Sequence, residues 1–322
     1  MAVPLRTQLA WAAINLVERR PVMQQAPERI LRARKRRARV SRLPGNWIVT
    51  GRPDSRAVIS KGEITLADGA VLPLRIYRPK APSTGRLPVV VNFHGGGWVS
   101  GNARQSEWWC AGVAAQAAVV VVSVEYRLAP EYRFPVPVED CYAATAWVAA
   151  NAASLGVDPK RLAVMGDSAG GNLAAAVALM ARDRRTPDIA LQVLIYPSLD
   201  AARGFPSETE NAKGPALTQK DVLNTPRIYL RDVEAEASNP YASPLRGNPE
   251  ALPPAIIQTA QYDPLRDHGY AYAKRLKAAG VDVWHTNYED AVHGYISTPG
   301  IVPAAKIALR DAVAGIHDVL RT

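Results

Sequence analysis

One serine in this chain lies where a catalytic nucleophile would be expected. Ser168 belongs to the run Gly-Asp-Ser-Ala-Gly-Gly that begins at Gly166, between a strand-like stretch, 161–165, and a helix-like stretch, 172–180. Small neighbours allow a tight, strained strand-to-helix turn, which exposes the serine Oγ beside the positive end of a helix dipole. A serine presented in this way attacks carbonyl carbons. A glycine-rich turn that merely caps a helix is the alternative, so a base, an acid and oxyanion donors must be found elsewhere.

The base is expected to be a histidine on a loop after a late strand. Three histidines follow Ser168 and precede the final helix pattern. His285 lies inside a strand pattern and His268 opens a helix, whereas His293 precedes a glycine in the loop after the last strand. Because open α/β sheets place their sites at the carboxyl ends of strands, His293 is the predicted base.

The acid is expected at the carboxyl end of the strand before that one. Asp263 follows the strand pattern of residues 255–260 and would reach the same edge of the sheet as His293. Asp267 is the main rival, but it directly precedes a helix, where N-capping is the ordinary role of an aspartate. Asp290 is close to His293 in sequence and stays a second alternative.

Donors for an oxyanion hole are expected from the glycine run after the strand that ends at Phe93. His94 is followed by three glycines, whose backbones bring N–H groups close to a reacting atom where a Cβ would collide. The predicted donors are the amides of Gly96, Gly97 and Ala169, the last being the residue after the nucleophile. A phosphate-binding P-loop is excluded, because no Lys-Ser or Lys-Thr pair follows the glycines.

Alternating strands and helices are predicted to position these residues. Continuous apolar runs, as expected of parallel strands buried on both faces, cover 88–93, 118–126, 161–165, 191–196, 255–260 and 281–288. Helix patterns cover 138–153, 172–180, 268–279 and 304–320. Residues 57–66 and 71–77 alternate as a hairpin ahead of them. This order predicts an α/β fold with a mostly parallel central sheet flanked by helices.

Two segments interrupt the regular alternation. Residues 199–245 hold short polar helical pieces where a strand and a helix would be expected, and residues 1–56 are helical and basic. We therefore predict a catalytic core made of residues 57–198 and 246–322. The N-terminal segment, 1–56, and the inserted segment, 199–245, are predicted to form a helical cap.

Positive charge is concentrated in the N-terminal segment. The chain of 322 residues has a net charge of +10, and residues 1–56 hold 13 Lys or Arg against 3 Asp or Glu. We interpret this as the polar face of a helix whose apolar face packs on the core through Ile30, Leu31, Ala33, Ala38 and Val40. Contact with an anionic membrane surface is the alternative. A nucleic-acid partner is not favoured, because no aromatic residues are interleaved to stack bases.

The apolar stretches and the cysteines narrow the expected class of protein further. No stretch is long enough to span a bilayer, and the short apolar run 8–17 lacks a signal-peptide cleavage site and predicts an amphipathic helix. A cytoplasmic protein is expected. Cys110 and Cys141 lie in apolar stretches and are expected to be buried, reduced thiols, and no cysteine cluster for a metal is present.

Together, these motifs resemble one known family. From about residue 57 to its end, the chain resembles the hormone-sensitive-lipase-like branch of the α/β-hydrolases, the bacterial carboxylesterases with the Gly-Asp-Ser-Ala-Gly signature. The matching stretches occur in the family's order: His-Gly-Gly-Gly-Trp at 94–98, Tyr-Arg-Leu-Ala-Pro-Glu at 126–131, the serine motif at 166–171, Asp-Pro-Leu-Arg-Asp at 263–267 and His-Gly at 293–294. His268 and Tyr295 depart from the pattern, where such sequences more often carry an acid and a Phe.

The resemblance implies an α/β-hydrolase fold with a helical cap and the activity of a carboxylic-ester hydrolase. It implies that Ser168 attacks the ester carbonyl, that His293 transfers the proton, and that Asp263 holds the imidazole tautomer. It further implies small-molecule esters of short to medium acyl chains as substrates, and neither a cofactor nor a metal. An amidase or deacetylase with the same triad and a catalytically idle small-molecule binding protein are the alternatives, and a homodimer stays open.

Overall fold

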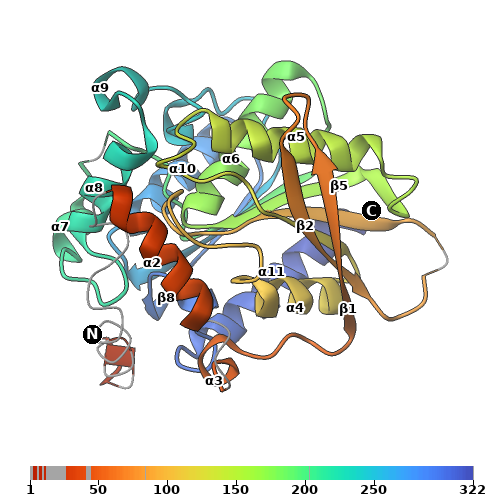
Figure 1. Ribbon diagram of the computed structural model, residues 1–322, viewed down its shortest axis with the longest axis horizontal. Helices are drawn as coiled ribbons and strands as arrows, with labels where there is room; N and C mark the ends of the chain where they lie inside the picture. The colour runs from red at the N-terminus through yellow and green to blue at the C-terminus, as the bar shows by residue number, and fades with distance from the viewer. Residues whose placement is uncertain are drawn as a thin grey trace.

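An eight-stranded sheet runs through the molecule, with helices on both of its faces (Figure 1). The computed structural model describes residues 3–5, 7, 8, 11, 27–40, 45–83, 85–202 and 204–321. The strands are β1 (Ala57–Thr65), β2 (Val71–Pro79), β3 (Leu87–Phe93), β4 (Val120–Val124), β5 (Val157–Asp167), β6 (Leu191–Ile195), β7 (Ala255–Tyr262) and β8 (Val283–Val292). They lie in the order β1-β2-β4-β3-β5-β6-β7-β8.

The sheet is antiparallel at one edge and parallel across the rest. β1 and β2 form an antiparallel hairpin, and β2 also pairs antiparallel with β4. From β4 to β8 each neighbouring pair is parallel. The central strands β4 and β6 are buried along their whole length, which suits parallel strands covered by helices on both faces. The predicted α/β class, the mostly parallel sheet and the N-terminal hairpin are confirmed.

Alternate side chains of the strands feed two separate apolar cores. Val89 and Val91 of β3 point to one face, where they join buried residues of α5 (Val136–Ala150), α6 (Ala169–Arg184) and α10 (Arg266–Ala278). Val90 points to the opposite face, which is covered by α4 (Glu107–Ala117) and α11 (Ala304–Leu320). This two-residue period of the pleat explains why the strands read as continuous apolar runs.

The helix α4 was not predicted from the sequence. Its residues 109–114 are all buried, so it carries no polar stripe that would mark a helical period. The largest differences in strand boundaries from the prediction are at β5 and β8. β5 begins at Val157 rather than Arg161, and β8 continues to Val292, the residue directly before His293.

Short helices interrupt the core where the sequence predicted a cap. The inserted segment contains α7 (Pro206–Glu210), α8 (Gln219–Tyr229), α9 (Val233–Glu236) and the 3₁₀ turn η2 (Pro244–Arg246), and its described residues form no strand. α8 begins with a capping box, in which Thr218 Oγ1 accepts from the Asp221 amide and the Asp221 carboxylate accepts from the Thr218 amide. Figure 1 shows α2 (Pro27–Val40) on the same side of the molecule as α7 and α8.

The arginine-rich helix α2 packs partly as predicted. Ile30 and Ala33 are buried in the main core, but Leu31 is 41% exposed, so its predicted place on the apolar face is wrong. The side chains of Ala38 and Val40 lie outside the described residues, as does most of the amphipathic helix predicted over 8–17. Among the side chains of α2 that the structure describes, the exposed ones are Arg29, Leu31, Arg32, Lys35, Arg36 and Arg39.

The two cysteines are buried and unpaired, as expected. Burial raises the pKa of both thiols, Cys110 and Cys141, so they stay protonated at neutral pH. Within the described ranges, no helix combines the length and the apolar character needed to cross a membrane. A short helix, α3 (Trp47–Thr50), and a 3₁₀ turn, η3 (Tyr295–Ser297), complete the described elements.

Candidate active site

Three side chains from distant parts of the chain meet at the carboxyl edge of the sheet. The Ser168 Oγ lies 2.9 Å from His293 Nε2, and His293 Nδ1 lies 2.7 Å from Asp263 Oδ2. Ser168 stands at the junction of β5 and α6, Asp263 directly follows β7, and His293 directly follows β8. The structure therefore brings together the nucleophile, acid and base that the sequence predicted.

The hydrogen bonds of the acid determine which ring nitrogen of His293 carries a proton. Asp263 is fully buried, and its Oδ1 accepts from the Leu265 amide at 2.8 Å. Its Oδ2 is free to accept from an Nδ1–H group, which leaves a lone pair on Nε2 that faces the Ser168 hydroxyl. The arrangement is a continuous chain for moving the serine proton onto the imidazole.

The serine is held in a backbone conformation that L-residues rarely adopt. Ser168 has φ of 55° and ψ of −116°, and its amide donates to the Ile195 carbonyl at 2.9 Å. The turn requires glycine nearby, because a Cβ on Gly166 would lie 2.2 Å from the Gly170 carbonyl oxygen. A Cβ on Gly170 would lie 2.0 Å from the carbonyl oxygen of Phe93. The motif thus forms the strained elbow that its spacing predicted.

The rival histidines lie in structural positions. His285 is in β8, where Thr259 Oγ1 lies 3.0 Å from its Nε2. His268 is fully buried in α10, and its Nδ1 accepts from the backbone amides of Leu199 and Asp200. Neither ring reaches the serine, which leaves His293 as the base that the geometry supports.

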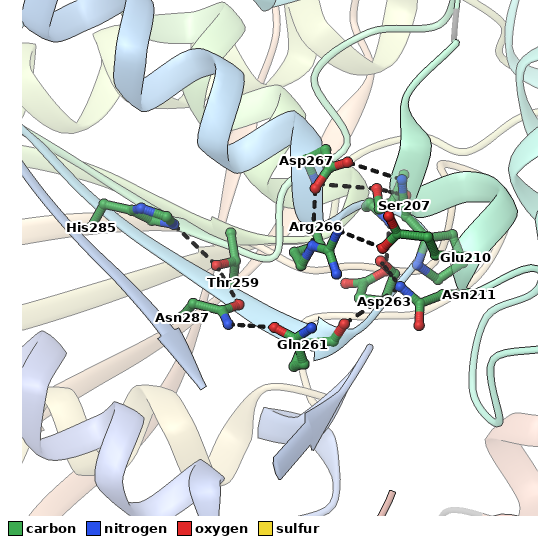
Figure 2. Close-up of polar contacts among 12 residues, drawn as sticks. Ser207, Glu210, Asn211, Thr259, Gln261, Asp263, Arg266, Asp267, His285 and Asn287 are labelled. Atoms are coloured by element: carbon green, nitrogen blue, oxygen red, sulfur yellow. Dashed lines mark hydrogen bonds and ion pairs between the residues drawn. The ribbon is translucent and has the colours of Figure 1, made fainter. Parts of the chain in front are cut away.

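The rival acids also have other partners or positions. N-capping of α10 by Asp267 was predicted and is wrong, because the residue before that helix is Leu265. Asp267 lies in the first turn of α10, and its carboxylate accepts from the Ser207 amide at 2.9 Å, at the start of α7 (Figure 2). A carboxylate that accepts from an amide in the first turn of a helix is the interaction expected of an N-cap. Here that helix is α7 and not α10. Asp290 is exposed on β8.

A polar network ties the loop of the acid to α7 of the inserted segment (Figure 2). Asn211 Nδ2 donates to the backbone carbonyls of Gln261 and Asp263, at 3.4 and 3.3 Å. Arg266 forms an ion pair with Glu210 at 2.7 Å. The backbone around Asp263 is therefore held by contacts from the inserted segment as well as by its own strand.

The glycine loop after β3 has the backbone shape expected of an oxyanion hole. Gly96 and Gly97 have φ of 127° and 64°, and a Cβ on Gly96 would lie 2.1 Å from the Ser100 carbonyl oxygen. Within the described part of the chain, neither the Gly96 amide nor the Gly97 amide has an acceptor. These amides and that of Ala169, at the N-terminus of α6, are free to bind an oxyanion.

The base of this loop is braced by buried side chains. His94 is fully buried and stacks on Tyr126, with ring centroids 4.4 Å apart, and the Tyr126 hydroxyl donates to the His94 carbonyl at 2.6 Å. Asp167 Oδ1 accepts from the Gly95 amide at 2.8 Å. These contacts fix the first residues of the glycine loop against the core.

Comparison with known proteins agrees with this geometry. Residues 90–297 match the sequence model of a protein family whose description is alpha/beta hydrolase fold. This range includes the glycine loop and all three members of the proposed triad.

This chain belongs to the α/β-hydrolase fold family.

Relatives of this α/β-hydrolase carry names of esterases. The chain is 43% identical over 259 residues to esterase LipI of Mycobacterium tuberculosis, covering 79% of this chain and 80% of the relative. It superposes on a thermostable esterase from Pseudomonas putida with a TM-score of 0.87 and 36% identity, covering 99% and 98% of the two chains. An ester hydrolase from the metagenome of Lake Arreo, solved with a bipyridine phosphonate derivative, gives a TM-score of 0.90, 32% identity and full coverage of both chains. The family resemblance predicted from the motifs is confirmed.

A pocket opens beside the nucleophile of this α/β-hydrolase. Core residues of the elbow and glycine loop form one wall, and the inserted segment forms another; the lining residues are Gly97, Trp98, Ser168, Ala169, Ser198, Asp200, Leu217, Val222, Thr225, Pro226 and Leu265. Trp98 of the glycine loop stacks on Tyr229 of α8, with centroids 4.4 Å apart. Residues of the inserted segment therefore line the same pocket as Ser168.

Two residues that support the glycine loop lie inside the sequence motifs but were not linked to that loop. Tyr126 opens the 126–131 motif, and Asp167 precedes Ser168. Arg127 of the 126–131 motif forms ion pairs with Asp140 at 2.6 Å and Asp68 at 2.9 Å. Nothing in the sequence distinguished Arg34, which contacts the glycine loop, from its neighbouring arginines.

Asp167 is expected to make the stability of this α/β-hydrolase depend on pH. Burial raises the pKa of its carboxyl, which lies between the Gly95 amide and the Tyr196 hydroxyl, the latter at 3.3 Å. Above about pH 4, the ordinary pKa of an aspartate, the folded state therefore holds more protons than the unfolded state. The contribution of Asp167 to the free energy of unfolding is therefore largest at low pH. It decreases as the pH rises through the pKa that the carboxyl has in the folded state.

Asp167→Asn should remove this pH dependence while keeping the contacts. The amide oxygen can accept from Gly95 and the amide nitrogen can donate to Tyr196. The melting temperature of the variant minus that of the wild type should therefore increase between pH 4 and pH 8. A difference that stays constant or decreases over this range would show that the carboxyl is ionised at no cost in the folded protein.

Proposed function

We propose that Ser168, His293 and Asp263 are the catalytic triad of a carboxylic-ester hydrolase. The function rests on the family and on its esterase relatives. The observation that supports these residues as its catalysts is the chain of two hydrogen bonds, 2.9 and 2.7 Å, from serine to histidine to aspartate. The three roles follow from which atoms face one another.

In acylation, Ser168 Oγ attacks the ester carbonyl carbon as its proton moves to His293 Nε2. The imidazolium that forms is stabilised by Asp263, whose carboxylate has no exposure to water and already accepts from the Leu265 amide. The bond from the carbonyl carbon to the alcohol oxygen then breaks. His293 donates its proton to that oxygen, and the alcohol leaves an acyl group on the serine.

In deacylation, water takes the place of the serine hydroxyl. His293 Nε2 accepts a proton from the water, whose oxygen attacks the acyl carbon, and returns that proton to Ser168 Oγ as the acid is released. Negative charge develops on the carbonyl oxygen in both steps. We propose that the amides of Gly96, Gly97 and Ala169 bind it, each donor being worth roughly 3 kcal/mol of barrier.

The substrates proposed for this site are small-molecule esters with short to medium acyl chains. Supporting this, the pocket lies between the elbow and α8, and apolar residues of the inserted segment such as Leu217 and Val222 line it. We propose that this segment, 199–245, and the N-terminal segment, 1–56, form a cap over a core of residues 57–198 and 246–322. An amidase or deacetylase with the same triad stays the alternative.

Hydrolysis of a p-nitrophenyl ester series, from acetate to laurate, beside one p-nitroanilide tests this proposal. We expect turnover of the esters with a maximum among the shorter chains, and anilide turnover at least about 100-fold slower. Val222→Ala, which removes two methyl groups from the pocket wall, should shift the maximum to longer chains. Anilide turnover equal to that of the esters would favour the amidase alternative, and an unchanged maximum would place the acyl chain elsewhere.

Contact of α2 with an anionic membrane and assembly into a homodimer are further proposals. The basic side chains that α2 exposes support the first. Co-sedimentation with phosphatidylglycerol vesicles, compared with phosphatidylcholine vesicles, would test the membrane contact. Binding to the phosphatidylglycerol vesicles that is no stronger than binding to the phosphatidylcholine vesicles would exclude it. Sedimentation velocity would test the dimer, and a single species at the monomer mass would exclude it. The cytoplasmic location stays a prediction from the sequence.

A further inference from the structure

One arginine of the basic helix α2 points into the molecule. Arg34 has an 18% exposed side chain, whereas Arg32 and Lys35 on either side of it are exposed. It follows the buried residue Ile30 by four positions, so it lies on the same face of the helix, one turn further along. The helical period thus carries a charged side chain to the core together with the apolar ones.

The guanidinium of Arg34 connects two loops beside the active site. Its Nε donates to the Val99 carbonyl at 2.5 Å, and its Nη2 donates to the Ala129 carbonyl. Its Nη1 forms an ion pair with Glu131 at 2.7 Å. Val99 belongs to the glycine loop, and the other two residues belong to the 126–131 segment. Three donors on one planar group are thus used at once, which a lysine cannot reproduce.

Val99 is closely coupled to the proposed oxyanion donors. The Gly96 carbonyl accepts from the amides of Val99 and Ser100, at 3.2 and 3.0 Å. The peptide that contains the Gly97 amide is the same peptide that carries the Gly96 carbonyl. A displacement of Val99 would therefore rotate the group that orients the Gly97 N–H.

The glycine loop is held at its first residues, His94 and Gly95, by contacts within the core, and at its later residues, Trp98 and Val99, by contacts that include one from α2. At the first arm, His94 and Gly95, the Asp167 carboxylate accepts from the Gly95 amide and the Tyr126 hydroxyl donates to the His94 carbonyl. The second arm is joined to the 126–131 segment by one backbone bond, from the Ala129 amide to the Trp98 carbonyl at 2.9 Å. Arg34 adds the adjacent link, through the Val99 carbonyl. The cap thereby completes the support of the loop.

We propose that Arg34 is a positioning residue for the oxyanion hole, through which α2 holds the outer arm of the glycine loop so that the Gly96 and Gly97 amides stay directed at the reacting oxygen. The inference rests on the proposed function of this site. It gives the N-terminal segment a role in the chemical step, beyond covering the substrate.

The test compares Arg34→Ala and Arg34→Lys with Arg32→Ala, which removes the same charge from the exposed face of the same helix. The measurements are kcat and KM for p-nitrophenyl butyrate, the melting temperature, and the inhibition constant of an alkyl trifluoromethyl ketone. This ketone forms a tetrahedral adduct with the serine, so its affinity depends on the oxyanion hole. A short-chain alcohol, as a competitive inhibitor without an oxyanion, reports on the pocket alone.

Loss of one complete oxyanion donor lowers kcat by about 10²–10³-fold, and misalignment of the loop should cost a part of this. We expect Arg34→Ala to lower kcat by roughly tenfold and to weaken the ketone by a similar factor, with KM and alcohol binding changed less than about twofold. Arg34→Lys should fall between this variant and the wild type, because one ammonium cannot join both carbonyls. Arg32→Ala should stay within about twofold of the wild type in every measurement.

Three results would overturn the inference. The first is an increase in KM with unchanged kcat and ketone affinity, which would make Arg34 a residue of the substrate pocket. The second is an equal loss in Arg32→Ala, which would indicate a general effect of α2. The third is unchanged kinetics in a folded Arg34→Ala protein.

If Arg34→Ala does not fold, the Arg34→Lys variant and Glu131→Gln decide the question. Glu131→Gln removes the charge partner while leaving the two carbonyl contacts, so it should lower kcat and ketone affinity together by less than Arg34→Lys does. An increase in KM in both variants, with kcat and ketone affinity unchanged, would contradict the inference. Failure of the proposed function would appear separately, as ester turnover that is absent in the wild type or that survives Ser168→Ala.

Discussion

Replacing Ser168 by alanine is expected to lower kcat for p-nitrophenyl butyrate by about 10⁵-fold or more. The Oγ is the atom that forms the acyl-enzyme bond, and the imidazole 2.9 Å away then has no hydroxyl to deprotonate. Alanine keeps the backbone amides of the elbow and the small volume that the turn requires. The purified variant should therefore keep its circular dichroism spectrum and melting temperature while it loses the burst of p-nitrophenol that accompanies acylation.

Ser60→Ala is a matched control for this variant, because Ser60 is an exposed serine in β1 at the antiparallel edge of the sheet. It should retain wild-type kinetics. Turnover by Ser168→Ala within about tenfold of the wild type would exceed what the remaining binding groups can supply, and the nucleophile would have to be sought elsewhere.

Replacing His293 by alanine should be about as damaging as removing the serine, because the two residues act as one unit in proton transfer. His293 is 8% exposed, and its ring also contacts Tyr196, with ring centroids 4.8 Å apart. Its removal leaves a small space and takes away the donor to Asp263 Oδ2, while Oδ1 keeps its bond from the Leu265 amide. The expected result is a fall of about 10⁵-fold in kcat, measured with the same ester.

His285→Gln is the control that separates the base from the histidine near the amino end of β8. Its amide can still donate to Thr259, so we expect kcat within about threefold of the wild type. His268→Ala would be a poorer control, because two backbone amides would lose their acceptor in the core. If His285→Gln melted normally but lost as much activity as His293→Ala, the assignment of the base would be wrong.

Much of the active site was predictable because its requirements are local. A serine between small residues at a strand-to-helix junction can be recognised from a few positions, since a Cβ at Gly166 or Gly170 would meet backbone atoms 2.2 and 2.0 Å away. Asp263 and His293 could be assigned because parallel strands bring their carboxyl ends to one edge of the sheet. β7 was predicted because it is a continuous apolar run buried in the sheet. The expectation that the strand before His293 is also buried on both faces is wrong, because β8 lies at the edge of the sheet and exposes alternate residues.

The errors arose where a residue's partners are distant in sequence. Asp267 was predicted to cap the helix that follows it, and it instead accepts from the Ser207 amide 60 positions earlier. Leu31 was predicted to be buried and is exposed, although Ile30 and Ala33 pack as expected. The helix α4 was missed because both the sheet and α11 cover it, which removes the polar stripe on which a sequence-based prediction depends.

The order of motifs in this chain was sufficient to predict the hydrolase family and to propose a serine nucleophile, its base and its acid, because each motif follows from the geometry of its own turn or strand end. Packing in three dimensions was needed to distinguish Arg34 from the other arginines of α2, to place the inserted segment against the pocket and to pair Asp267 with α7. The contacts of Arg34 and Asp267 join residues that are 60 to 97 positions apart. Neither composition nor local spacing encodes such a pairing, since it depends on how α2 and the inserted segment pack against the rest of the chain.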